Sequence, residues 1–231
     1  MPLHRRKLLK TSAGLAITAF VGGQPAAASN SGSCQPRDPL KNLTEGNQRF
    51  CNAWQEAARN PSTNLGSELQ NNRCFNAPQT LFNEQHPWAT LLTCADSRVS
   101  PSWIFDTTPG ELFVIRSAGN TAFDAAIASI EYSVSILQTP LVMVMGHSGC
   151  GAVSTAMGEA ALTPSLERLI SPIRSQIANS PDLAAAVRSN ALGTAATLRE
   201  NSTLLRQAEA TGALKLVVSY FDLQTGAVTL I

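Results

Sequence analysis

The chain has 231 residues, of which 44% are hydrophobic and 14% charged, and its formal net charge is +1 at pH 7. This length is enough for one sizeable hydrophobic core. A charge so close to zero gives no field that recruits nucleic acid or an anionic membrane, so a small or neutral substrate suits the chain better than a polyanion. No apolar run is long and clean enough to require a membrane span in the mature protein.

The N-terminal segment has the three parts of an export signal. A basic head contains Arg5 and Arg6, and a weakly apolar stretch follows over 15–21. Small residues then lead up to Ala28, so we expect residues 1–28 to be an export signal cleaved after Ala28. The paired arginines resemble a twin-arginine (Tat) signal, and an ordinary secretory signal or an uncleaved amphipathic tail are the alternatives. The expected destination is the periplasm or another extracytoplasmic compartment, such as a thylakoid lumen.

After a linker over 29–38, helical and strand patterns alternate in one domain over 39–231. The predicted elements are, in chain order, a helix over 40–60, a loop with a short helix over 61–77, strands over 89–93 and 112–116, a helix over 121–137, a strand over 141–145, helices over most of 165–210, a strand over 214–220, and a short β segment after a turn at 224–226. This alternation predicts a single α/β domain with a mainly parallel central β-sheet flanked by helices.

Five cysteines divide into two groups. Cys94 and Cys150 lie in motifs with other reactive residues, whereas Cys34, Cys51 and Cys74 lie in the N-terminal half of the mature chain. An oxidising destination permits disulfides, and an odd number leaves at least one cysteine for another role. One pair among the three N-terminal cysteines can form a disulfide, but the sequence does not choose that pair.

Two predicted strands end directly at residues suited to binding a metal. The first runs into Cys94, and the most apolar strand ends at Gly146-His147, with Cys150 three residues further on. Functional residues gather beyond the carboxyl ends of strands in such sheets. Two cysteines and one histidine suit a tetrahedral zinc and leave the fourth position open for water or substrate. Taken singly, each cysteine can equally be a small buried hydrophobe, and Asp96 is a candidate for an occasional fourth ligand.

These motifs, with several others, resemble the β-class carbonic anhydrases. The paired signature is carried by residues 94–101 (CADSRVSP) and 146–153 (GHSGCGAV). The resemblance covers nearly everything from Pro39 to the C-terminus, although Ser117 stands where the family usually has Asn. The supporting segments are 43–50 (LTEGNQRF), 113–120 (FVIRSAGN), 130–132 (IEY) and 220–226 (YFDLQTG).

The resemblance implies specific roles for named residues. Cys94, His147 and Cys150 would bind Zn²⁺, and Asp96 and Arg98 would form a catalytic dyad. Substrate contacts would come from Gln85, Phe113, Tyr132 and Gly151. Some of these groups come from the neighbouring subunit in the family, so the resemblance implies a homodimer or a higher even oligomer. Gln85 also favours a constitutively open zinc site over the form in which the aspartate closes onto the metal.

The implied reaction is the reversible hydration of carbon dioxide to bicarbonate and a proton. Zinc would lower the pKa of its bound water, and Asp96, paired with Arg98, would orient the resulting hydroxide. Three alternatives remain open: hydrolysis of carbon disulfide or carbonyl sulfide at the same site, a non-catalytic zinc- or bicarbonate-binding subunit of an exported assembly, and a thiol redox protein. The last fits poorly because the chain contains no Cys-x-x-Cys sequence.

Overall fold

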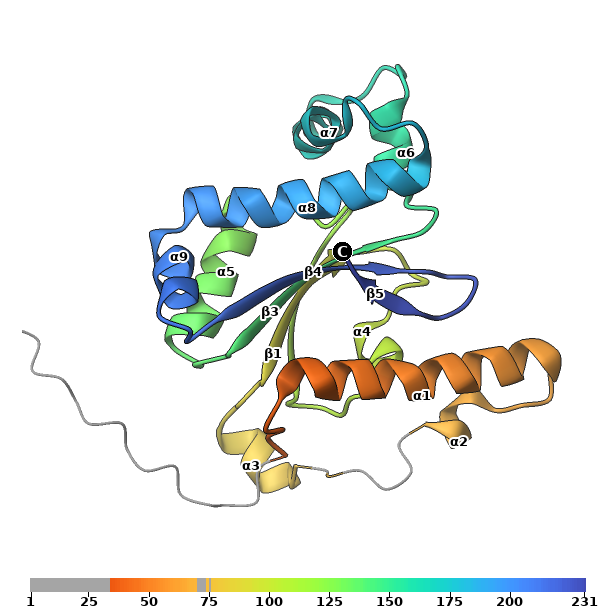
Figure 1. Ribbon diagram of the computed structural model, residues 1–231, viewed down its shortest axis with the longest axis vertical. Helices are drawn as coiled ribbons and strands as arrows, with labels where there is room; N and C mark the ends of the chain where they lie inside the picture. Colours follow the sequence, from red (N-terminus) through yellow and green to blue (C-terminus); the bar gives the residue numbers. More distant parts are fainter. Residues whose placement is uncertain (1–33, 70–73, 75) are drawn as a thin grey trace, which may run out of the picture. The chain divides into compact units, whose positions relative to one another are not determined.

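The computed structural model describes residues 34–69, 74 and 76–231. The expected export signal over 1–28 and the first half of the expected linker lie outside the described residues. The described chain is an α/β domain, as predicted, with a five-stranded sheet between helices (Figure 1). None of the helices in the described part of the chain is long and apolar enough to cross a membrane.

The central sheet has the strand order β2-β1-β3-β4-β5. Strands β1 to β4 are parallel, and β5 pairs antiparallel with β4. Uninterrupted apolar sequence predicted that the strand before His147 is buried on both faces, and both β1 and β3 are indeed buried along their whole length. The strands span Ala89–Cys94 (β1), Leu112–Ser117 (β2), Leu141–His147 (β3), Lys215–Phe221 (β4) and Val228–Leu230 (β5).

Alternating side chains of the strands feed two separate cores. On one face, Leu91 and Met143 pack with helices α1 (Pro39–Arg59) and α4 (Pro101–Ile104). On the other face, Leu92 and Val144 pack with α5 (Asp124–Ser135), α8 (Leu183–Asn201) and α9 (Thr203–Ala210). Helices therefore lie on both faces of the sheet, which explains why its inner strands β1 and β3 are buried along their whole length (Figure 1).

The remaining helices are short or lie at the carboxyl ends of the strands. Helix α6 (Gly151–Met157) follows β3 and contacts α7 (Pro164–Ile177), which in turn packs on α8. The predicted short helix over 61–77 is α2 (Leu65–Glu68), whereas α3 (Pro78–Asn83) and α4 were not predicted. Each of these has six residues or fewer, too few for a helical repeat of apolar residues to show in the sequence.

Helix α5 is shorter at both ends than the predicted span of 121–137. At its start, the Ser117 hydroxyl accepts a hydrogen bond from the Thr121 amide at 3.0 Å, and this closes a turn that contains Asn120 at φ 48°. At its end, Gln138 takes a positive φ of 57°. These left-handed residues lie just outside 121–137 and limit the stretch in which a helix can form. Within that stretch, the extended backbone of Phe123 (φ −81°, ψ 163°) makes Asp124 the first helical residue. Ser117, whose consequence was not derivable from the sequence, closes the turn that precedes α5.

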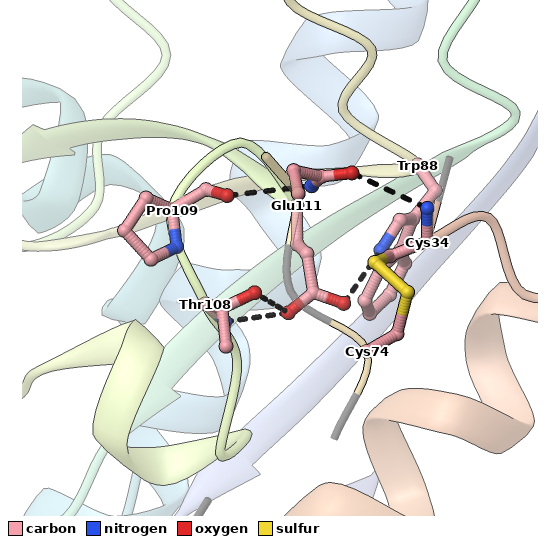
Figure 2. The surroundings of a disulfide bond; sticks show 7 residues. Cys34, Cys74, Trp88, Thr108, Pro109 and Glu111 are labelled. Atoms are coloured by element: carbon pink, nitrogen blue, oxygen red, sulfur yellow. Dashed lines mark hydrogen bonds between the residues drawn. A yellow bond between two sulfur atoms is a disulfide. The ribbon is translucent and has the colours of Figure 1, made fainter. Parts of the chain in front are cut away.

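A disulfide joins Cys34 to Cys74, which settles the pairing that the sequence left open (Figure 2). The third N-terminal cysteine, Cys51, is buried in α1 and carries a free thiol. The disulfide lies close to Trp88, whose indole N–H donates to the Glu111 carboxylate at 3.3 Å. The polypeptide just before α1 is thus fastened to the segment that precedes β1.

Candidate metal centre

Cys94, His147 and Cys150 come together at the carboxyl edge of the sheet. Cys94 is the last residue of β1, His147 is the last residue of the neighbouring strand β3, and Cys150 caps the N-terminus of α6. Their candidate ligand atoms all lie within 4.8 Å of one another, and the two sulfur atoms are 3.9 Å apart. All three side chains are buried. Parallel strands that end side by side therefore assemble the predicted group.

The imidazole of His147 is oriented for a metal by its other nitrogen. Nδ1 lies 3.0 Å from the main-chain oxygen of Ser148, so that Nδ1–H donates to this carbonyl. The lone pair is then on Nε2, which is buried and finds no hydrogen-bond partner among the described residues. A buried nitrogen with a free lone pair, aimed at two thiols, has the donor character that zinc requires. The residues present therefore fit the metal.

The two thiols titrate as a pair. The pKa of Cys94 is lowered to about 4, chiefly by the hydrogen bond from Cys150 and further by His147 and by the Gly119 amide, which donates to the sulfur at 3.3 Å. The pKa of Cys150 is raised because it shares its proton with Cys94 and is itself buried. The metal-free site thus holds one thiolate and one thiol, and a metal that takes both sulfurs must displace a proton.

Asp96 and Arg98 form the predicted pair beside the metal group. Oδ1 of Asp96 accepts from Nε of Arg98 at 2.9 Å, and Oδ2 accepts from Nη2 at 2.7 Å. The Arg98 guanidinium, and secondarily its main-chain amide, hold the pKa of the Asp96 carboxyl well below its ordinary value. Oδ2 is also 3.8 Å from Nε2 of His147. An ionised carboxylate therefore stands at the edge of the metal group, held there by a bidentate arginine.

Comparisons with known proteins agree with this site. A sequence profile described as carbonic anhydrase matches residues 89–228, more than half of the chain. The chain belongs to the carbonic anhydrase family. The structure of a Coccomyxa β-carbonic anhydrase in complex with acetazolamide is 25% identical with a TM-score of 0.61 over 85% of this chain and 87% of the other. Family and fold together place the chain in the β class, whose metal is zinc.

Individual relatives show how far the similarity extends. Carbonic anhydrase 2 of Mycobacterium tuberculosis is 38% identical over 51% of this chain and 50% of its own length. A carbonic anhydrase of Pseudomonas aeruginosa is 32% identical over 65% of this chain and 76% of its own length. The match thus spans about half the length of the first of these relatives. A tetrameric β-carbonic anhydrase of Sordaria macrospora, at 24% identity and a TM-score of 0.59 over 78% of this chain and 92% of its own, shares the fold.

The expected substrate residues do not all lie at the metal group. Gly151 does, as the first residue of α6 directly after Cys150, with open space beside its Cα. Gln85 is exposed and precedes β1, whose six residues separate it from Cys94 by roughly 20 Å. Phe113 is paired in register with Thr90, at the opposite end of β1 from Cys94.

Phe113 and Tyr132 lie together instead. Their ring centroids are 6.2 Å apart, and Tyr132 is 44% exposed. Along β2, Phe113 is four residues before Ser117, the partner of Cys94, and is therefore roughly 13 Å from the metal end of the sheet. Within one chain, then, Gln85, Phe113 and Tyr132 are remote from the metal group. The main-chain groups of Gly119 and Ser148 that contact the ligands were not predicted.

Proposed function

We propose that this carbonic anhydrase catalyses the reversible hydration of carbon dioxide to bicarbonate and a proton, with zinc held by Cys94, His147 and Cys150. The observation that carries the proposal is the Asp96 carboxylate, which Arg98 holds 3.8 Å from the ligand nitrogen of His147. A site that only stored zinc would have no use for an ionised carboxylate beside the fourth coordination position, which the three protein ligands leave open.

When bound, zinc lowers the pKa of a coordinated water, so that a hydroxide nucleophile exists near neutral pH. Asp96 would accept a hydrogen bond from the attacking oxygen and turn a lone pair of that oxygen toward the carbon atom of the substrate. A C–O bond would form as one C=O π bond of carbon dioxide opens onto its oxygen, and the proton of the water would leave to solvent. Arg98 keeps Asp96 ionised and engages both of its oxygens, which supports the open form of the site rather than the form in which Asp96 closes it.

The test is carbon dioxide hydration measured by stopped flow, with zinc content assayed in parallel. We expect Asp96→Asn to keep its zinc and to lose about 10²-fold or more in kcat, because the amide cannot accept and orient in the same way as the carboxylate. Leu192→Ala, an exposed substitution on α8, is the control and should match the wild type. Equal rates in Asp96→Asn and wild type would refute the proposed role of Asp96.

The same assay separates the rival substrates. If the wild-type protein carries zinc but hydrates no carbon dioxide, the proposed reaction is wrong. A panel containing carbonyl sulfide and carbon disulfide then tests the sulfur hydrolase, and inactivity on all three leaves the non-catalytic binding subunit.

We further propose that the working unit is a homodimer or a higher even oligomer, in which Gln85, Phe113 and Tyr132 serve the partner's site. Support comes from the sheet edge: β2 is an edge strand, and Val114 and Ile136 are 38% and 65% exposed near it. Apolar side chains along an unpaired edge favour association. Ile136→Glu should shift sedimentation toward the monomer, whereas Leu192→Glu, equally charged but on α8, should not. A wild-type monomer with full activity would contradict the proposal.

Export to an extracytoplasmic compartment, with residues 1–28 as the signal, is also proposed. The Cys34–Cys74 disulfide supports it, because such bonds persist in oxidising compartments and are rare in the cytosol of mesophiles. Fractionation of cells that express the full chain tests it: a mature protein that begins near Ser29 in the periplasm is expected, and an uncleaved cytoplasmic protein would contradict it.

A further inference from the structure

Arg116, on β2, makes all three of its side-chain hydrogen bonds to main-chain oxygens of the loop that follows β1. Its Nε donates to the oxygen of Cys94 at 3.0 Å. Its Nη2 donates to the oxygens of Asp96 and Val99, in both cases at 2.7 Å. One planar group thus contacts the backbone at the start, the middle and the end of the segment 94–99.

These oxygens need a donor because the sheet ends at this point. The last pair in the ladder between β1 and β2 is Cys94 with Ser117, and the Ala95 amide makes one more bond, to the Ser117 oxygen at 2.9 Å. Beyond it the chain leaves the sheet, and its carbonyl groups lose the partners that a strand would provide. The guanidinium group offers several N–H donors in a fixed plane, so that it fixes the three oxygens relative to one another.

The segment that Arg116 holds carries most of the chemistry of the site. Cys94 supplies a ligand sulfur, Asp96 supplies the carboxylate, and Arg98 supplies the guanidinium that keeps this carboxylate ionised. Arg98 acts on the side chain of Asp96, whereas Arg116 acts on its main chain. None of the three bonds of Arg116 reaches a ligand atom or the carboxylate, so any effect it has on the chemistry passes through the backbone.

We propose that Arg116 is a positioning residue, which fixes the backbone of residues 94–99 and thereby the direction from which Cys94 and Asp96 face the metal. The inference rests on the proposed zinc site. Loss of the guanidinium removes one donor from each of three carbonyl oxygens at the point where β1 ends, and the segment relaxes. The Asp96 oxygen keeps its bond from the Val99 amide at 3.0 Å. We therefore expect substitution of Arg116 to change the geometry and the release rate of a bound metal, and not merely to lower the thermal midpoint.

A second arginine provides a matched control for stability. Arg206 in α9 also donates to main-chain oxygens, those of Arg199 and Glu200, at the junction of α8 and α9. Arg116 lies in β2 and Arg206 in α9, and neither is near the metal ligands in sequence. Arg206→Gln therefore removes bonds to main-chain oxygens, as Arg116→Gln does, together with one to the Thr203 hydroxyl, without touching the segment 94–99.

The experiment loads metal-free protein with Co²⁺, which reports ligand geometry through its visible absorption. The proteins are wild type, Arg116→Gln, Arg116→Lys and Arg206→Gln. For each, the visible spectrum, the rate of Co²⁺ release to a chelator and the thermal midpoint are measured. We expect Arg116→Gln to release Co²⁺ about 10–100-fold faster than wild type and to show an altered spectrum, as for other groups that orient metal ligands. Arg116→Lys should release Co²⁺ at a rate between those of wild type and Arg116→Gln, because one ammonium group replaces only some of the N–H donors of the guanidinium.

Arg206→Gln should lower the thermal midpoint but keep the wild-type spectrum and release rate. If Arg116→Gln has the wild-type spectrum and release rate, the proposal is overturned, whatever its thermal midpoint. If Arg116→Gln does not fold, Arg116→Lys is judged by the same two readouts. A wild-type protein that binds Co²⁺ but hydrates no carbon dioxide as the zinc form would refute the proposed function, and the release rates would still decide the role of Arg116.

Discussion

At the scale of single residues, main-chain atoms tune the side chains that do the chemistry. The Ser148 carbonyl fixes which nitrogen of His147 is free, and the Gly119 amide donates to the Cys94 sulfur. Ser148 is itself anchored, since its amide donates to the Phe221 oxygen and its hydroxyl accepts from the Leu223 amide, both at 2.9 Å. The C-terminal strand and turn therefore take part in holding the metal group.

The paired thiols predict how metal uptake depends on pH. With the pKa of Cys94 lowered to about 4 and that of Cys150 raised, the pair holds one proton at pH 7. Metal binding therefore displaces about one proton from the thiols, and affinity should rise about tenfold per pH unit near neutrality. The ultraviolet absorbance of thiolate in the metal-free protein, titrated against pH, counts the thiolates directly. The absence of thiolate absorbance at pH 7 would show that Cys94 is not a thiolate in the metal-free protein.

Side-chain chemistry at the site could be predicted from the sequence because strands that end in reactive residues deliver them to one edge of a parallel sheet. The group of Cys94, His147 and Cys150 follows from that rule. The Asp96–Arg98 pair was implied by the resemblance to the family. The contacts of Gly119 and Ser148 do not, because every residue has an amide and a carbonyl and only the fold decides which of them face a ligand.

At the scale of elements, the turn between β2 and α5 is the most constrained connection at the site. Gly119 has φ +77°, and a Cβ added there would lie 2.5 Å from Cδ1 of Ile173 and 3.2 Å from Cβ of Ala152. Gly212 has nearly the same φ, +75°, but a Cβ there meets nothing within 4 Å. An added Cβ would thus meet backbone strain at both glycines but steric crowding only at Gly119, so that a comparison of the two separates these costs.

Substitution of these glycines gives a paired prediction. Gly212→Ala should lower the free energy of unfolding by about 1–2 kcal/mol through backbone strain alone. Gly119→Ala should lose about 1–3 kcal/mol more through crowding and should also bind zinc more weakly, because its amide donates to Cys94. Urea unfolding and a zinc titration measure both effects. An equal loss of unfolding free energy in the two variants would show that the turn at Gly119 accommodates the added methyl group without a steric cost.

Long elements were predicted well and short ones poorly, for a physical reason. The buried strands and α1, which starts at Pro39 after the capping side chain of Asp38, carry repeating patterns over several residues. The ends of α5 depend on the extended backbone of Phe123 and on the left-handed backbone of Gln138, features of single residues that no repeat reveals. The pairing of the cysteines depends on how the chain folds between them, and no local sequence pattern predicts that.

At the scale of the whole molecule, the Cys34–Cys74 disulfide closes a loop of 40 residues in sequence separation that includes α1. We expect the double variant Cys34→Ala/Cys74→Ala to lose about 2–4 kcal/mol of unfolding free energy, chiefly because its unfolded chain is less constrained. Urea unfolding with and without reductant measures this. Reductant should destabilise the wild type to the same level and leave the double variant unchanged; destabilisation of the variant by reductant would contradict the assignment.

The central claim is that Cys94, His147 and Cys150 hold the zinc on which carbon dioxide hydration depends. Its most direct test is zinc content and stopped-flow hydration, measured together on wild type and Cys150→Ser. The account predicts about one zinc per chain and rapid hydration in the wild type, with both lost in the variant. Wild-type hydration in Cys150→Ser, or full zinc without hydration in the wild type, would contradict it.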